Sequence, residues 1–298
     1  MGSPCPAAEL GPSAIAPHGS MVPQPEIALH RRHGLARARH HWGMSAPRPN
    51  LRARLRAGET TYGVFLNLGS PLAAELCARG GCDWLIIDLE HGAANESGLL
   101  EHLYAVGATD TAAIVRPASG ERLRIGRALD YGADGIMVPR IDTAEQAREA
   151  VSFLRWPPDG TRGLALLTRG AELGEVAHGS ISALNQRVIG VIQVESPEAV
   201  ANANEVAAID GVDVLFVGPT DLSHSMGMPG RFDDPDFVEA LRTVVAATEA
   251  HGKTAGILLR DASTLNTYRD LGFRFIGLGS DGAFVVDGLR AVLDLARA

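Results

Sequence analysis

Residues 188–221 read VIGVIQVESPEAVANANEVAAIDGVDVLFVGPTD. Two runs rich in valine, isoleucine and leucine, 188–195 and 212–217, stand on either side of a stretch whose apolar residues have helical spacing, 197–209. Neither run alternates strictly between apolar and polar residues, which is typical of parallel strands that are buried on both faces. This stretch therefore predicts a strand, a helix and a second strand parallel to the first.

The same pattern recurs on both sides of this unit. Further apolar runs at 62–67, 84–89, 112–116, 135–139, 254–259 and 273–278 bring the expected strands to eight, and helical patterns occupy 70–79, 121–131, 143–154 and 234–251. Eight such repeats within about 250 residues match the usual size of a (β/α)8 barrel. A doubly wound open sheet is the main alternative, but it would not usually need eight repeats. We therefore expect an α/β protein with a (β/α)8 TIM barrel, in which 164–186 forms a long βα excursion that carries a helix or a lid.

The first 50 residues differ from the rest of the chain. They hold eight prolines and five of the ten histidines, with no sustained periodicity and no apolar segment that follows a basic start. We expect a disordered leader or a translation start at Met21 or Met44, and a single catalytic domain over 51–298. The basic run at 29–41 leaves a transit peptide or an anion-binding arm as alternatives.

Charge and composition narrow the classes of partner. The net charge of −8 argues against nucleic acid as a partner, and no apolar run approaches the roughly 18 residues that a membrane span needs. Cys5, Cys77 and Cys82 form neither a CxxC site nor a disulfide framework, so we expect reduced thiols and a cytoplasmic protein.

Polar residues follow the carboxyl ends of several expected strands. Asp88, Glu90 and His91 end the second strand, Arg116 the third and Gln193 with Glu195 the fifth, and Asp221 follows the sixth. In a barrel this is the face where the βα loops converge on one cavity and where catalysis occurs. The clustering on different strands therefore predicts an active site there.

Glu195 and Asp221 are the natural metal ligands of this set. Two carboxylates offer hard oxygen ligands and leave positions on Mg²⁺ or Mn²⁺ for water and a bidentate 2-oxo acid. Zn²⁺ fits less well, because no cysteine joins the set. A pair of solvated or salt-bridged carboxylates would give the same pattern.

His91 and Arg116 are the candidates for proton transfer and for binding a carboxylate or enolate oxygen, respectively. A histidine that caps the next helix, or an arginine in a salt bridge, would explain them as well. Lys253 is the only lysine among the 27 basic residues, and it stands just before the seventh expected strand, at the opposite end of the barrel. Schiff-base catalysis needs a lysine at the active site, so its position favours a metal as the enolate stabiliser.

Residues 277–282 have the spacing GxGxxG, which could cradle a phosphate. Too little chain follows for the second strand of a dinucleotide-binding unit, so we interpret this segment as a turn. We expect no organic cofactor.

The chain resembles the HpcH/HpaI aldolase/citrate lyase family, and within it the class II, metal-dependent pyruvate aldolases. The resemblance rests on GGCDWLIIDLEHG (80–92), VRP (115–117), ALDYGADGIMVP (128–139), WPPDGTRG (156–163), QVE (193–195) and GVDVLFVGPTDLS (211–223). It implies a barrel of the phosphoenolpyruvate/pyruvate type, with Mg²⁺ or Mn²⁺, or else Co²⁺, as the cofactor.

The resemblance also implies roles for particular residues. Glu195 and Asp221 would bind the cation, and His91 would act as the base. Arg116 would polarise the keto-enolate oxygen, and Asp130 would raise the basicity of His91. Gln193, Asp221 and the backbone around Thr220 would contact the substrate. The implied reaction is reversible cleavage of a 4-hydroxy-2-oxo acid to pyruvate and an aldehyde.

Two loops depart from the family pattern: the residues after His91–Gly92 and those after Arg162–Gly163. We expect both to lie where the aldehyde would be recognised. The alternatives are an oxaloacetate-type decarboxylase, a CoA-thioester lyase of the same superfamily and a non-catalytic 2-oxo-acid binding protein. The resemblance further implies a homo-oligomer, a hexamer built as a trimer of dimers that exchange the C-terminal helix at 284–298.

Overall fold

The structure is a computed structural model, and it describes residues 50–259 and 261–298. The expected leader at 1–50 lies outside these residues except for Asn50, whose side chain accepts a hydrogen bond from the backbone of Ala53 at the start of the first helix.

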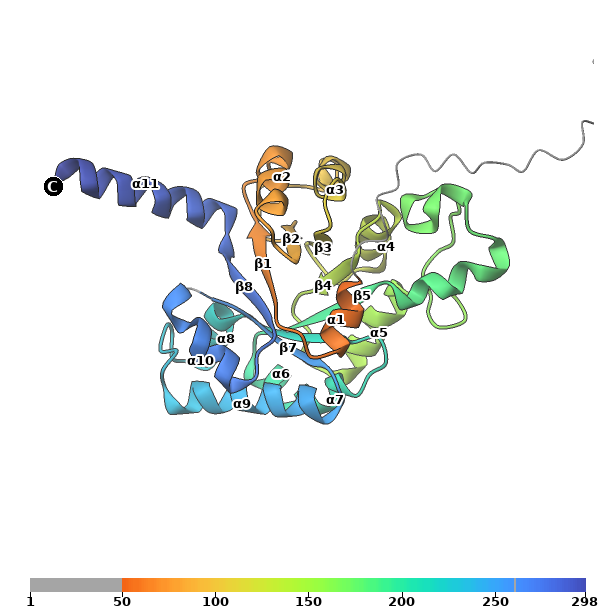
Figure 1. Cartoon of the computed structure of the whole chain (residues 1–298). Helices are drawn as coiled ribbons and strands as arrows, with labels where there is room; N and C mark the ends of the chain where they lie inside the picture. Colours follow the sequence, from red (N-terminus) through yellow and green to blue (C-terminus); the bar gives the residue numbers. More distant parts are fainter. Residues whose placement is uncertain (1–49, 260) are drawn as a thin grey trace, which may run out of the picture. The chain divides into compact units, whose positions relative to one another are not determined.

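Eight parallel strands close into a barrel in the order of the sequence, so the predicted (β/α)8 fold is confirmed (Figure 1). The strands are β1 (Thr61–Leu66), β2 (Trp84–Asp88), β3 (Ala112–Arg116), β4 (Gly135–Val138), β5 (Ile189–Val194), β6 (Val214–Val217), β7 (Thr254–Leu258) and β8 (Phe275–Ser280). Pairing of β1 with both β2 and β8 closes the ring.

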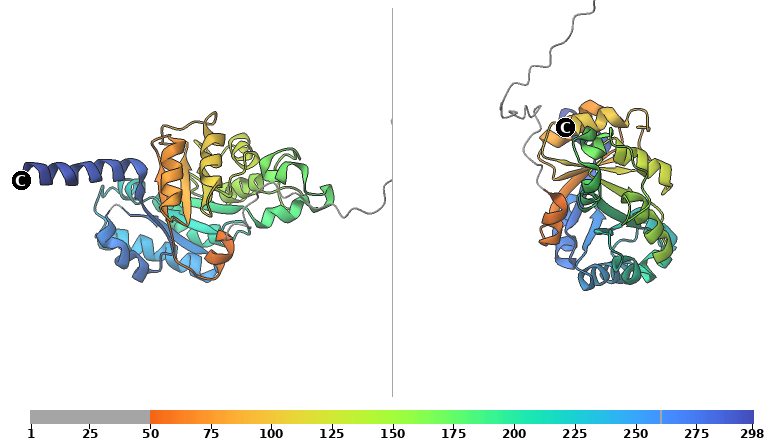
Figure 2. Two further views of the ribbon diagram at one scale, coloured as in Figure 1. Left: turned by 45° about the horizontal axis from the view of Figure 1, so that its top comes forward. Right: turned by 90° about the vertical axis from the view of Figure 1, so that its right-hand side faces the viewer.

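Helices surround the strands, as the two views in Figure 2 show. They are α1 (Leu51–Arg56), α2 (Pro71–Arg79), α3 (Leu99–Gly107), α4 (Arg122–Asp130), α5 (Ala144–Leu154), α6 (Pro197–Ala201), α7 (Ala203–Ala207), α8 (Pro219–Ser225), α9 (Pro235–Ala250), α10 (Leu265–Leu271) and α11 (Asp281–Arg297), with short 3₁₀ helices η1 (Arg169–Gly174), η2 (His178–Gln186) and η3 (Ala262–Thr264). Many begin at residues that favour helix starts. Ser70 and Ser196 cap α2 and α6 with their side chains, and a proline follows each of them. None of the helices in the described part of the chain is both long and apolar enough to cross a membrane.

Side chains of each strand alternate between two buried layers. Trp84 and Ile86 of β2 belong to a cluster inside the barrel, whereas Leu85 and Ile87 pack in the layer between strands and helices. The interior is filled by aromatic rings, since the rings of Trp84 and Phe275 stack with centroids 3.9 Å apart. Gly63 makes room for this stack, because a Cβ there would lie 2.1 Å from the indole of Trp84. The barrel is therefore a packed core, and ligands must bind at its ends.

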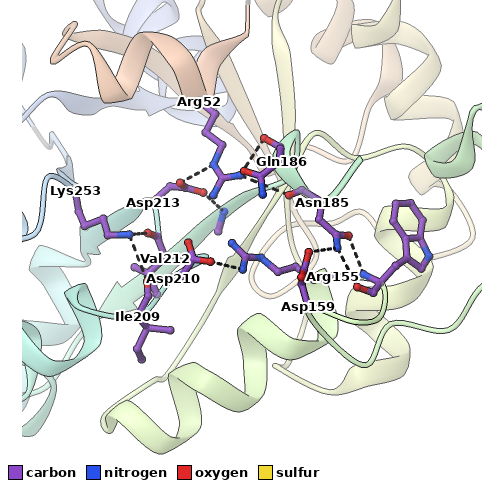
Figure 3. A network of polar contacts seen from close by, with 12 residues as sticks. Arg52, Arg155, Asp159, Asn185, Gln186, Ile209, Asp210, Val212, Asp213 and Lys253 are labelled. Carbon is purple, nitrogen blue, oxygen red and sulfur yellow. Dashed lines mark hydrogen bonds and ion pairs between the residues drawn. The ribbon is translucent and has the colours of Figure 1, made fainter. Parts of the chain in front are cut away.

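The amino-terminal end of the barrel is occupied by α1 and a polar network (Figure 3). Arg52 is 2% exposed, and its Nε lies 2.7 Å from Oδ1 of Asp213, which directly precedes β6. Nζ of Lys253 donates to the carbonyl oxygen of Val212 at 2.7 Å. Burial lowers the pKa of Lys253, while the carboxylates of Asp213 and Asp210 oppose that effect. The only lysine is thus a structural part of the end of the barrel opposite the strand-end carboxylates.

Two details of the sequence interpretation are corrected. The helix expected at 197–209 is divided into α6 and α7, because Asn202 leaves helical geometry with ψ near 2°. The segment 164–186 holds η1 and η2 and is not a βα excursion. It follows α5 and precedes β5, so it is an αβ connection at the amino-terminal end of the barrel, where Nε of Arg169 donates to the carbonyl of Tyr131.

Candidate active site

The alternation that builds the core also points polar side chains into the carboxyl-terminal mouth of the barrel. On β2 and β3 the inward residues continue from Ile86 and Ile114 to Asp88 and Arg116, which are register partners. On β5 the inward series continues from Val191 to Gln193. A period of two residues per strand therefore assembles these groups above the apolar interior.

Arg116 is clamped by two carboxylates. Its Nε and Nη2 donate to Oδ1 and Oδ2 of Asp88 at 2.9 and 2.7 Å, and its Nη1 lies 3.2 Å from Oε2 of Glu90. The guanidinium also stands over the ring of Phe65, 5.3 Å from its centroid. Burial would lower the pKa of Arg116, but Asp88, Glu90 and Glu195 raise it above its ordinary value. Arg116 therefore forms the salt bridge that was the alternative interpretation of this residue. The carboxylates of Asp88 and Glu90 hold its guanidinium, which stays protonated, in one orientation.

Glu195 is the most strongly perturbed acid of the site. Burial, together with the charges of Asp221 and Glu90, raises its pKa to about 7, while Arg116 and the backbone amide of Arg140 act in the opposite direction. These influences identify the neighbours of the Glu195 carboxylate. Three acids that follow β5, β6 and β2 therefore lie at the mouth, and the charges of Asp221 and Glu90 disfavour the ionised form of Glu195.

Two neighbours hold the Glu195 carboxylate in place. Nε2 of Gln193 donates to its Oε1 at 2.8 Å. Gly218, which follows β6, lies so close that a Cβ there would be 2.8 Å from the same oxygen. Only glycine leaves this space open, so the β6–α8 turn and the carboxylate depend on each other.

Asp221 lies in the first turn of α8, directly after this turn, and Thr220 precedes it. Both residues are on the exposed side of the helix start. The charge of Asp221 acts on Glu195, which indicates that these two carboxylates are close in space. They are the two residues that the sequence suggested as metal ligands.

The donor set fits a hard divalent cation on two grounds. The mouth gathers the carboxylates of Asp88, Glu90, Glu195 and Asp221 around one guanidinium, which leaves an excess of negative charge that a cation would neutralise. In addition, Oε1 of Gln193 is buried without a hydrogen-bond partner, although it sits beside Glu195. Within 50–259 and 261–298 no three His, Cys, Asp or Glu side chains are arranged as a ready-made metal cluster, so a cation would take part of its coordination from water or substrate.

His91, like Asp221, is an exposed member of the site. Its side chain is 64% exposed, and its Nε2 lies 3.9 Å from Oε2 of Glu90. Its backbone N–H donates to Oδ1 of Asp88 at 3.2 Å, which anchors the loop after β2 to the clamped Arg116. The alternative role as a helix cap is wrong, because the N-cap residue of α3 is Gly98 and no side chain caps that helix.

Asp130 is the one candidate that the fold separates from the rest. It ends α4, and since the helices of this barrel run opposite to the strands, it lies at the amino-terminal end, away from His91. Its Oδ1 accepts from Nη2 of Arg162 at 2.8 Å, and that guanidinium stacks over Trp156 at 3.8 Å. Within one chain the structure does not bring Asp130 to His91.

The two loops that depart from the family pattern lie at opposite ends of the barrel. The loop after His91 borders the mouth, as expected. The loop after Arg162 belongs to the αβ connection at the other end, so the expectation that it recognises the aldehyde is wrong within one chain. At 277–282 the turn interpretation is wrong, because 277–280 is the end of β8 and α11 begins directly at Asp281. Oδ1 of Asp281, 4% exposed, accepts from the backbone N–H of Asn67 and of Gly282, and an acidic side chain thus fills the place of an anion.

Sequence reasoning assigned no role to Asp88, Glu90 or Arg140. Asp88 and Glu90 were visible as acids at a strand end, but their contact with Arg116 depends on the register of β2 with β3. Arg140 follows β4 without any motif that would single it out.

Comparison with known proteins agrees with this architecture. A model of the HpcH/HpaI aldolase/citrate lyase family matches residues 61–288. The chain is 38% identical over 255 residues to a hydroxypyruvate/pyruvate aldolase of Delftia acidovorans, covering 86% of this chain and 95% of that protein. It is also 38% identical to a 4-hydroxy-2-oxovalerate aldolase of Novosphingobium aromaticivorans, covering 83% and 95%.

The crystal structure of an HpcH/HpaI aldolase/citrate lyase family protein from Burkholderia cenocepacia is similar, with a TM-score of 0.79 and 37% identity over 83% of this chain and 99% of that one. The chain therefore belongs to the HpcH/HpaI aldolase/citrate lyase family and is an enzyme of the carbon–carbon lyase type.

Proposed function

We propose that the protein is a divalent-cation-dependent aldolase that cleaves a 4-hydroxy-2-oxo acid to pyruvate and an aldehyde, and that also runs in the direction of aldol addition. The observation that carries this proposal is the grouping of Glu90, Glu195 and Asp221 beside the clamped Arg116 at the barrel mouth. The relatives named as pyruvate or hydroxypyruvate aldolases support the same chemistry.

Glu195 and Asp221 would hold the cation, with Mg²⁺ or Mn²⁺ as the first choice and Co²⁺ as a further candidate. A bound divalent cation supplies Lewis-acid stabilisation of negative charge on the 2-oxo group of the substrate. The site has an independent reason to need it, because three acids share the mouth and the pKa of Glu195 is raised to about 7 without a cation.

Arg116 has donors left for the substrate. A guanidinium carries five N–H groups, of which the hydrogen bonds to Asp88 use two, while Nη1 forms an ion pair with Oε2 of Glu90 at 3.2 Å. The remaining N–H on each of Nη1 and Nη2 can bind the carboxylate and the 2-oxo oxygen of the substrate. Since the clamp fixes the guanidinium in advance, little reorganisation is needed when negative charge develops on that oxygen.

His91 would accept the proton of the C4 hydroxyl. Its exposed ring can reach a substrate in the mouth, and imidazole is a base near neutral pH. As the proton leaves, the C3–C4 bond breaks, the C4 carbon becomes the aldehyde carbonyl, and the electron pair passes into the enolate of pyruvate. Protonation of the enolate at C3 then completes pyruvate. Gln193 and the backbone around Thr220 would contact the acid half.

No lysine is available for the alternative Schiff-base mechanism. Lys253 donates to backbone carbonyls at the opposite end of the barrel. Asp130 and Arg162 have no part in this mechanism within one chain, and we assign their ion pair to holding the αβ connection against α4.

The experiment that tests the proposal is an aldol assay with pyruvate and a panel of aldehydes, after EDTA treatment and after return of Mg²⁺, Mn²⁺ or Co²⁺. We expect activity to disappear with EDTA and to return with the cation. Oxaloacetate is assayed in parallel, since decarboxylation passes through the same enolate. Aldol activity that survives complete removal of metal would refute the mechanism, and turnover of oxaloacetate alone would make the protein a decarboxylase.

We further propose a cytoplasmic homo-oligomer, with a hexamer as the expected form. Cys77 and Cys82 are free thiols. Except for Asp281, the side chains of α11 are not buried, and its apolar residues Phe284, Val285, Val286, Leu289, Val292, Leu293 and Leu295 are exposed. In Figure 1 this helix extends away from the barrel. So large an apolar surface is expected to be covered by another subunit, and sedimentation of the wild type and of Leu289→Asp tests this.

A further inference from the structure

Asp281 is a buried carboxylate at the mouth of the barrel that the proposed reaction leaves without a role. It follows β8 at the same end of the barrel as Asp88 and Arg116, and it is the first residue of α11. Only 4% of it is exposed, and an aspartate is almost never so deeply buried unless its charge has partners. In the described part of the chain no arginine, lysine or histidine forms an ion pair with it. The groups that stabilise it are therefore backbone donors.

Most of these donors belong to the loop between β1 and α2. Oδ1 of Asp281 accepts from the N–H of Asn67 at 2.9 Å and from that of Leu68 at 3.3 Å. It also accepts from Gly282, in its own helix, at 2.8 Å. A carboxylate that served only the start of α11 would need no more than the last contact. The other two are hydrogen bonds to a charged acceptor, which are stronger than neutral ones, and they join the β1–α2 loop to the start of α11.

The β1–α2 loop in turn supports the loop that carries His91. The carbonyl oxygen of Asn67 accepts from the backbone N–H of Ala93 at 2.9 Å. A Cβ on Gly92 would lie 3.2 Å from Cα of Asn67. A Cβ on Gly69, whose φ is +65°, would lie 2.9 Å from the carbonyl carbon of Ala93. The two loops therefore lie backbone against backbone, and each provides a glycine at the contact.

The imidazole of His91 depends on this support from the main chain. Its Nε2 lies 3.9 Å from Oε2 of Glu90, which is too far for a hydrogen bond, and no other side chain among the described residues holds the ring. The position of the ring therefore follows from the backbone of its loop. That backbone is held on one side by Asp88, which accepts from the N–H of His91, and on the other side by Asn67.

We propose that Asp281 is a positioning residue for His91, because its carboxylate fixes the β1–α2 loop against which the His91 loop rests. This inference rests on the proposed aldolase function, in which His91 exchanges a proton with the C4 hydroxyl. Proton transfer requires the imidazole within hydrogen-bond distance of that hydroxyl, and a displacement of about 1 Å can lower the rate about 100-fold. Loss of the Asp281 carboxylate therefore slows proton transfer and leaves the groups that bind the cation and the pyruvate half in place.

The test measures kcat and the KM for pyruvate of the full-length enzyme with its cation, using the aldehyde that the wild type turns over fastest, and the affinity of EDTA-treated protein for Mn²⁺. Asp281→Asn keeps the shape of the side chain and removes its charge. Gly69→Ala disturbs the contact between the two loops from the other side. Each change is also combined with His91→Ala. The matched control is Asp83→Asn, since Oδ2 of Asp83 accepts from the backbone N–H of Tyr62 at 2.8 Å, at the opposite end of β1.

We expect kcat to fall about tenfold or more in Asp281→Asn and in Gly69→Ala, because the base is displaced from the substrate. The KM for pyruvate and the affinity for Mn²⁺ should change less than about twofold, as for independent sites. In the His91→Ala enzyme the same two changes should alter the residual kcat by less than about twofold, since the group that they displace is already absent. Asp83→Asn should lower the unfolding temperature and leave kcat unchanged.

An unchanged kcat in Asp281→Asn, or an equal fall with and without His91, would overturn this inference and leave the aldolase function standing. A fall of the same size in Asp83→Asn would attribute the effect to a general loss of stability around β1 and would overturn it as well. If Asp281→Asn does not fold, Gly69→Ala decides by the same criteria. A His91→Ala enzyme as fast as the wild type would instead remove His91 from the proposed mechanism, and this inference would fail with it.

Discussion

Glu195 makes the metal-free protein less stable as the pH rises, and Glu195→Gln removes this effect. The carboxyl has an ordinary pKa of 4.5, which burial, Asp221 and Glu90 raise to about 7 in the folded chain. Between these two values the folded state retains a proton that the unfolded state has lost. By linkage, the free energy of unfolding then decreases with increasing pH across this window.

The magnitude follows from the size of the shift. One pKa unit corresponds to about 1.4 kcal/mol, so a change from 4.5 to about 7 corresponds to about 3 kcal/mol when fully developed. Below pH 4.5 both states are protonated and Glu195 makes no difference. Above pH 7 the whole penalty is present. For a chain of this size, about 3 kcal/mol amounts to roughly 5–10 °C in the unfolding temperature.

The assay is thermal unfolding of EDTA-treated protein at pH 5 and pH 8, for the wild type, Glu195→Gln and Glu205→Gln. Glu205 is exposed on α7, which makes it a control for the loss of one surface charge. Glu195→Gln should unfold several degrees higher than the wild type at pH 8 and at a similar temperature at pH 5. Added Mn²⁺ should stabilise the wild type at pH 8 but not Glu195→Gln.

The result that would refute this reasoning is a Glu195→Gln protein that differs from the wild type by the same amount at both pH values. Such a result would mean that Glu195 ionises at an ordinary pKa and that neither its burial nor the neighbouring carboxylates disfavour its charged form. A pH-dependent gain in Glu205→Gln would instead attribute the effect to net charge.

Three further outcomes are expected. Glu195→Ala should abolish Mn²⁺ binding in titration calorimetry, whereas His91→Ala should bind the ion and lose turnover by about 10²- to 10⁴-fold, as loss of a general base predicts; loss of the ion in both would undo the assignment. Gly218→Ala should weaken Mn²⁺ binding at least tenfold, because its Cβ would lie 2.8 Å from a Glu195 oxygen, and unchanged affinity would mean that the carboxylate can move aside. Asp130→Asn should lower the unfolding temperature by a few degrees, since Arg162 is 3% exposed and loses its counter-charge, and unchanged stability would show that the pair is solvated.

The barrel itself was predictable from local sequence. Strands buried on both faces are continuous apolar runs, and each of the eight runs is a strand in the structure, with ends that differ by a few residues. Short helices were harder to see. α3 and α8 lack a long apolar period, and α6 and α7 appeared as one helix because the break at Asn202 leaves the hydrophobic pattern continuous.

Errors about position arose where direction along the barrel mattered. The segment after Arg162 and the carboxylate of Asp130 were both expected at the active site, and both lie at the other end. A motif specifies which residues are present, whereas the end of the barrel to which they belong depends on whether they follow a strand or a helix.

The sequence alone determined the fold class, the end of the barrel at which Glu195, Asp221, His91 and Arg116 lie, and the position of Lys253 at the opposite end, away from the site of a Schiff base, because each of these follows from periodicity and chain order. Tertiary structure decided which groups meet. The register of β2 with β3 joins Asp88 to Arg116, and burial together with the closeness of Asp221 and Glu90 raises the pKa of Glu195. These contacts depend on distances between strands far apart in the chain, and charges interact according to their separation in space and their burial, which no local pattern encodes.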